Sequence, residues 1–144
     1  MVLMLALLTW RVGGQEADSS EHGPALSELT KAGRPTVAPG YFMFPIAPGQ
    51  PGFLAGSMGE LRPNHFHGGL DIKTGGVVNK PVYAAADGYV SRLKQSSFGY
   101  GNVLYITHPN GLTTVYGHLN EFKGPEAVEL LRCQYEKQAY EVEL

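Results

Sequence analysis

Two histidines and an aspartate lie close together in the segment Arg62-Pro-Asn-His-Phe-His-Gly-Gly-Leu-Asp-Ile-Lys73. Imidazole nitrogens and carboxylate oxygens are ligands that Zn²⁺ accepts at ~2.0–2.2 Å. On a straight strand, four steps of ~3.3 Å would separate His67 from Asp71 by about 13 Å, which one ion cannot bridge. A helix would bring them together, but Gly68 and Gly69 disfavour a helix. We therefore predict that the chain bends at the glycines and that His67 and Asp71 converge.

This spacing alone also fits surface or hydrogen-bonded side chains, which are the more common explanation for a neighbouring histidine and aspartate. A second candidate is His118, at the end of the apolar segment Val115-Tyr-Gly-His-Leu119. A histidine there is accessible and titrates near neutral pH, so it could be a metal ligand, a general base or a hydrogen-bond donor. A capping or packing role is the alternative. His22 and His108 are expected to face solvent.

The elements that must position these residues are strands. Glycine makes up 19 of 144 residues, which is about 13% and roughly twice the usual ~7%, and there are ten prolines. This composition favours turn-rich β structure. Strands are predicted over residues 53–57, 82–86, 89–93, 103–107 and 112–116. Asp87-Gly88 and Asn110-Gly111 are expected to close two hairpins.

After His118 the pattern becomes helical. Pro125 suits the first position of a helix, and the segment 125–139 is predicted to be one. Val128, Leu131 and Tyr135 share one apolar face of that helix. Residues 140–144 alternate as the start of another strand would.

The N-terminal residues indicate export. The first ten residues, apolar except for Thr9, are too few to cross a bilayer, which takes ~20, but they suit the core of a secretory signal. We interpret residues 1–14 as a signal-peptide remnant, although no lysine or arginine precedes the apolar run, and expect a protein of the periplasm or cell envelope. Residues 15–52 are interpreted as a linker and extended segment. Membrane association is not otherwise indicated.

Composition excludes several kinds of protein. A formal net charge of -2 provides no basic surface for nucleic acid. The single cysteine, Cys133, excludes an intrachain disulfide and the cysteine-rich zinc sites.

Four motifs in order suggest a family. They are Asn64-His-Phe-His-Gly-Gly-Leu-Asp71, Pro81-Val-Tyr-Ala-Ala-Ala-Asp-Gly88, Gly99-Tyr-Gly-Asn102 and Tyr116-Gly-His-Leu119. Together they resemble the lysostaphin/LytM-like zinc metallopeptidases, which cut peptide bonds in bacterial cell-wall peptidoglycan. The resemblance covers about residues 53–119. It implies a mainly β fold, with an antiparallel sheet and a groove over the zinc ion, and a peptidoglycan peptide as the partner.

The resemblance also implies residue roles. His67 and Asp71 match the first two zinc ligands, and His118 matches a separate catalytic histidine. His65 matches no family role and remains an alternative ligand. Family members carry a later His-x-His motif that supplies the third ligand and another catalytic histidine. No histidine follows His118 in the remaining 26 residues (144 minus 118).

We therefore interpret residues 53–144 as the N-terminal part of a metallopeptidase domain, with a helical insertion at 125–139. The full protein is expected to be a zinc endopeptidase, and this 144-residue piece is expected to be inactive. One alternative is a non-catalytic LytM-type module that binds the wall or activates a separate hydrolase. The other is a β-rich carbohydrate-binding or interaction domain.

Overall fold

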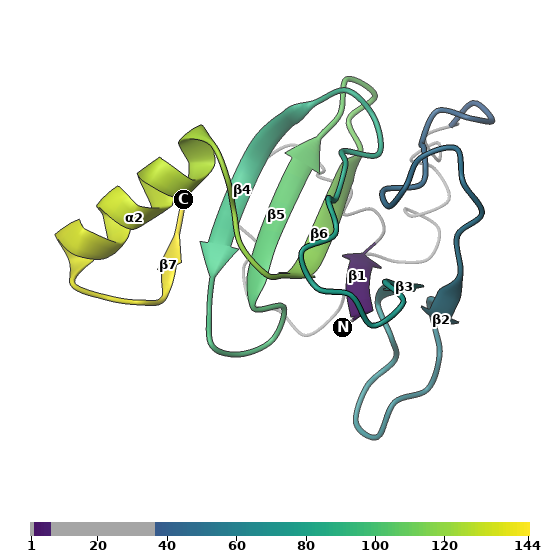
Figure 1. The fold of residues 1–144 in the computed structure, drawn as a ribbon, viewed down its shortest axis with the longest axis horizontal. Helices are drawn as coiled ribbons and strands as arrows, with labels where there is room; N and C mark the ends of the chain where they lie inside the picture. Colours follow the sequence, from purple (N-terminus) through teal and green to yellow (C-terminus); the bar gives the residue numbers. More distant parts are fainter. Residues whose placement is uncertain (1, 7–36) are drawn as a thin grey trace, which may run out of the picture.

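The computed structural model describes residues 2–6 and 37–144, which form one antiparallel sheet with a helix at its edge (Figure 1). The strand order is β2-β3-β1-β6-β5-β4-β7. The strands are β1 (Val2–Ala6), β2 (Leu54–Gly56), β3 (Gly69–Lys73), β4 (Tyr89–Gln95), β5 (Asn102–Thr107), β6 (Thr113–Leu119) and β7 (Val142–Glu143). Helix α2 (Pro125–Lys137) lies beside β4 and β7, at the opposite edge from β2 and β3. The predicted mainly β fold with a C-terminal helix is confirmed.

The hairpin predicted around Asn110-Gly111 is present between β5 and β6. Gly111 has φ +81°, a conformation that glycine adopts without steric cost. The Asn110 side-chain oxygen accepts a hydrogen bond of 3.0 Å from the Leu112 N–H. The turn therefore uses both residues that predicted it.

The hairpin predicted around Asp87-Gly88 is wrong. Residues 82–86 form no strand, since the chain bends at 85–87, and the Tyr83 N–H donates instead to the carbonyl of Pro45 at 2.9 Å. β4 pairs with β5 and β7. Gly88 does not have a positive φ, and a Cβ there would lie 2.5 Å from the carbonyl oxygen of Thr107. The glycine thus permits close approach to β5 rather than a tight turn.

The predicted apolar face of α2 does not face the core. Val128, Leu131 and Tyr135 are all more than half exposed. The buried positions are Leu130 and Cys133, which pack against side chains of β4 and β7. The helix lies beside the sheet edge, so the position of β7, rather than the spacing of apolar residues along the helix, determines which face of α2 is buried.

Strand β1 has a central position. It pairs antiparallel with β3 on one side and β6 on the other, and so joins the part of the sheet formed by β2 and β3 to the remaining strands. The rest of the segment interpreted as a signal remnant, and the predicted linker up to residue 36, lie outside the described residues. In the part that is described, no helix has the length and hydropathy needed to cross a bilayer.

Candidate metal centre

His67 and Asp71 converge, as their spacing predicted. The His67 Nε2 atom lies 3.1 Å from Asp71 Oδ1. His67 ends a narrow hairpin, in which its N–H donates to the Glu60 carbonyl and its own carbonyl accepts from the Gly59 N–H. β3 then starts two residues later in a new direction, so four residues do not span the ~13 Å of a straight strand. Gly68 has neither a positive φ nor a crowded Cβ position, so the bend does not require a glycine there.

The hydrogen bond made by the other ring nitrogen of His67 indicates how the pair can bind a cation. Nδ1 lies 2.9 Å from the carbonyl oxygen of Ser57, and a carbonyl only accepts, so Nδ1 carries a proton. In a neutral ring, Nε2 then presents a lone pair to the Asp71 carboxylate. Two lone pairs at 3.1 Å need a shared cation, which is a proton on Nε2 or a metal ion. An ion about 2.1 Å from each atom can bridge that gap, so the donors fit Zn²⁺.

The second carboxylate oxygen of Asp71 is held by an arginine. Arg62 Nη2 lies 2.7 Å from Asp71 Oδ2 and 3.3 Å from Glu60 Oε2. Gly56 leaves room for this contact, because a Cβ there would lie 2.6 Å from both Arg62 Nη2 and Asp71 Oδ2. Arg62 carries no signal in the sequence that would predict this contact. Arg62 lies nine residues before Asp71 in the sequence, and only the hairpin between them brings the two side chains into contact.

Among the described residues, His67 and Asp71 are the two candidate metal ligands that lie together, and a third is not present. No group of three or more histidine, cysteine, aspartate or glutamate side chains among them could hold one ion. His65, the alternative ligand, is exposed, and its Nδ1 lies 2.6 Å from the Asn64 side-chain oxygen. It takes no part in the contact between His67 and Asp71.

His118 stands apart from that pair. Asp71 pairs with Met4 of β1, which in turn pairs with Gly117 of β6, so Asp71 and Gly117 are separated by two strand spacings, or about 9.5 Å. His118 follows Gly117 directly, one residue beyond the part of β6 that pairs with β1. Its side chain is exposed, as predicted. The structure thus brings His67 and Asp71 together and leaves His118 on the far side of β1.

The backbone of His118 is unusual. It has φ 57°, in the left-handed region that residues other than glycine seldom occupy. Its N–H donates to the carbonyl of Tyr100 at 2.8 Å, and the two rings meet edge to face at 6.5 Å between centroids. This left-handed residue interrupts β6 one position before its last residue, Leu119, near the register shift between β5 and β6.

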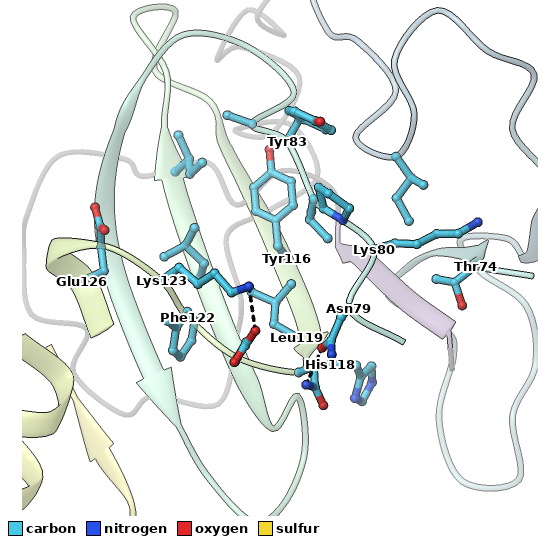
Figure 2. Close-up of a pocket in the computed structure, with 18 of the residues that line it drawn as sticks. Thr74, Asn79, Lys80, Tyr83, Tyr116, His118, Leu119, Phe122, Lys123 and Glu126 are labelled. Carbon is cyan, nitrogen blue, oxygen red and sulfur yellow. Dashed lines mark hydrogen bonds and ion pairs between the residues drawn. The ribbon is translucent and has the colours of Figure 1, made fainter. Parts of the chain in front are cut away.

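Figure 2 shows His118 at one end of a cavity of about 480 Å³, with Tyr116 further along its wall. β5 and β6 supply apolar lining residues, among them Leu104 and Ile106. The polar end near His118 includes Asn79, whose side-chain oxygen accepts 2.6 Å from the Asn120 amide. The metal-ligand pair is not part of this lining.

The expectation that His108 faces solvent is wrong. It is 2% exposed, with Nδ1 2.8 Å from the Asp87 carbonyl oxygen and Nε2 2.9 Å from Thr114 Oγ1. The Phe42 ring also packs against it, 5.2 Å between centroids. These contacts fasten the loop before β4 to β6, which is a structural role.

Part of the chain is similar to known proteins. Residues 65–129, a little under half of the chain, match Peptidase family M23. A curated relative, "DD-carboxypeptidase/endopeptidase Mpg" of Neisseria meningitidis serogroup B (strain MC58), is 46% identical over 46 residues, which are 32% of this chain and 10% of the relative. The protein of the same name from Neisseria gonorrhoeae is 48% identical over 42 residues, or 29% of this chain and 10% of that protein.

The alignments with these relatives thus cover about a tenth of each relative's length. No solved structure gives a significant match. The segment that matches Peptidase family M23 includes His67, Asp71 and His118, so the candidate site lies within the region of similarity.

Proposed function

We propose that this protein is, or is part of, a zinc-dependent endopeptidase that cleaves peptide bonds in bacterial cell-wall peptidoglycan. The contact between His67 and Asp71 carries the proposal, since it presents one nitrogen and one oxygen lone pair to a common point. The family match and the endopeptidase names of the relatives support the reaction class. Because the proposed substrate lies outside the cytoplasm, we also propose that the protein is exported to the cell envelope.

Each of the three residues has a role in the proposed reaction. His67 Nε2 and Asp71 Oδ1 would hold the ion, and the Ser57 carbonyl keeps the His67 proton on Nδ1, away from the metal. When bound, zinc would supply Lewis-acid activation of the scissile carbonyl and of a water nucleophile. His118 would donate a hydrogen bond to the developing oxyanion or move a proton to the leaving amine.

The backbone of His118 supports a functional role. Residues held in sparsely populated conformations cost about 1–3 kcal/mol each and cluster at functional sites. Here the bond to Tyr100 holds that conformation. Asparagine tolerates the left-handed region better than most residues, so His118→Asn should fold normally while removing the imidazole.

The two-ligand set limits what the 144-residue chain can do alone. Catalytic zinc sites normally use three protein ligands and a water. We therefore propose that this chain binds zinc weakly and does not cleave peptidoglycan without a further ligand, which a His-x-His strand would supply.

The test measures zinc content and hydrolysis of purified peptidoglycan by the chain and by the same chain extended through a His-x-His segment. We expect chelator-sensitive cleavage only in the extended protein, and its loss in His118→Asn. Robust, chelator-sensitive cleavage by the 144-residue chain would contradict the need for a further ligand. Cleavage by the extended protein that persists in His67→Ala would exclude zinc catalysis at this site.

The two-ligand set also favours one alternative, a non-catalytic LytM-type module that binds the wall or activates a separate hydrolase. A pull-down with insoluble peptidoglycan separates the two functions. Binding without cleavage by the extended protein would support the module.

A further inference from the structure

We propose that Arg62 is a positioning residue that restricts Asp71 to one metal-binding oxygen. This inference rests on the metal site proposed above. Arg62 Nη2 lies 2.7 Å from Asp71 Oδ2, while Asp71 Oδ1 faces His67 Nε2 at 3.1 Å. One oxygen of the carboxylate therefore has a permanent cationic partner, and the other is left for the ion.

Three features show that the contact is specifically built. The Asp71 side chain is only 16% exposed, so its carboxylate has little water to replace a lost partner. Gly56 leaves the space in which Arg62 and Asp71 meet, since any Cβ would lie 2.6 Å from both polar atoms. The adjacent Ser57 supplies the carbonyl that orients His67, so one short segment positions both candidate ligands.

An arginine beside a metal ligand would ordinarily repel a dication. Here Glu60 offsets that charge, because its Oε2 lies 3.3 Å from the same Arg62 nitrogen. The Ser57 N–H also donates to this oxygen at 3.3 Å and helps to hold Glu60 in place. An ion beside Asp71 therefore faces a nearly neutral Arg62–Glu60 pair. The remaining effect of Arg62 is to orient the carboxylate, which favours metal binding.

The contacts of Arg62 also predict which substitution can replace it. Both ion pairs use Nη2, whereas Nε is buried and has no hydrogen-bond partner among the described residues. A lysine ammonium can reproduce a single-point contact but not a bidentate one. Arg62→Lys should therefore preserve part of the function that Arg62→Ala loses.

The experiment titrates the chain extended through a His-x-His segment, which is the parent protein here, with Co²⁺ and follows the visible d–d absorption, which reports both affinity and coordination number. We expect Arg62→Ala to weaken Co²⁺ binding about 10-fold to 100-fold, as is usual when a residue orienting a ligand is removed. The d–d absorption of Co²⁺ bound to Arg62→Ala should also be weaker, because Asp71 without its arginine partner can bind through both oxygens and raise the coordination number. The Co²⁺ affinity of Arg62→Lys should lie between those of the parent and Arg62→Ala. Glu60→Gln should also weaken Co²⁺ binding, since it leaves the charge of Arg62 without compensation.

Arg92→Ala is the matched control. Arg92 contacts Glu143 at 2.6 Å near the other edge of the sheet, so Arg92→Ala removes a similar ion pair that lies far from His67 and Asp71. Thermal unfolding of every variant without metal separates a loss of folding from a loss of binding. Co²⁺ affinity in Arg62→Ala that equals or exceeds that of the parent would overturn the inference while leaving the metal site intact. No Co²⁺ binding by the parent chain would instead overturn the site itself.

Discussion

Replacing Asp71 by asparagine tests the metal centre without requiring catalysis. The substitution keeps the shape of the side chain and removes the charge that faces His67 Nε2 at 3.1 Å. A ligand that binds only the folded chain stabilises it by RT ln(1 + [L]/Kd), or about 2.7 kcal/mol when free metal is about 100 times Kd. For a domain of about 100 residues this corresponds to a rise in Tm of about 10 °C. We expect Asp71→Asn to abolish this rise.

The metal-free stability should change far less. The variant loses the charge of the 2.7 Å contact with Arg62, and hydrogen bonds to charged groups contribute ~1.5–3 kcal/mol. In return, the new amide N–H can donate to the His67 Nε2 lone pair, while the amide oxygen still accepts from Arg62. We therefore expect a net loss of about 1 kcal/mol.

The assay is thermal unfolding of both proteins, with and without Zn²⁺, followed by circular dichroism. Asp87→Asn is the control, because it makes the same chemical change at an exposed carboxylate whose residue contacts the fold through its backbone carbonyl. An equal zinc-induced rise in the parent and in Asp71→Asn would refute the assignment of Asp71 as a ligand. A rise that disappears in Asp87→Asn as well would show that zinc acts through general surface charge.

Three further perturbations test other parts of the structure. Gly56→Ala should displace the Asp71 carboxylate and weaken Co²⁺ binding by about 10-fold or more, and unchanged binding would contradict the steric argument. The guanidinium of Arg92 holds the pKa of Glu143 below its ordinary value of 4.5, so the ion pair stabilises the fold above about pH 4.5 and is lost as pH falls through the lowered pKa. The Tm difference between the parent and Glu143→Gln should therefore be present at pH 6 and disappear once the pH has fallen below that lowered pKa; a difference that does not change with pH would contradict the ion pair. Deleting residues 2–6 should lower the unfolding free energy by about 2 kcal/mol or more, since each backbone hydrogen bond that β1 makes contributes ~0.5–1.5 kcal/mol. The deletion should also speed amide exchange in β3, and an unaltered exchange rate would show that β1 is dispensable.

The convergence of His67 and Asp71 could be predicted because it follows from short spacing and a local bend. Arg62 could not be assigned, since its contact depends on a hairpin that brings three separate side chains together. Nor could the position of His118, because the strand between it and Asp71 comes from the far N-terminal part of the chain. Local patterns do not report which distant segment fills a place in a sheet.

The errors in predicting the fold have the same origin. Gly88 was consistent with a tight turn, yet its actual role is close approach to Thr107, which lies 19 residues away. His108 follows β5 at the start of a turn, and the turn signal was correct, but two distant segments cover its ring. A glycine or a turn histidine has more than one structural use, and only tertiary contacts decide between them.

The central position of β1 has a consequence for how the chain folds. Leu5 pairs with Tyr116, a separation of 111 residues (116 minus 5), so β1 can pair with β6 only after the intervening residues have been synthesised. Pairings between residues so distant carry a large loop-closure entropy and form slowly. Until then, the facing backbones of β3 and β6 are unpaired edges, to which other strands can add.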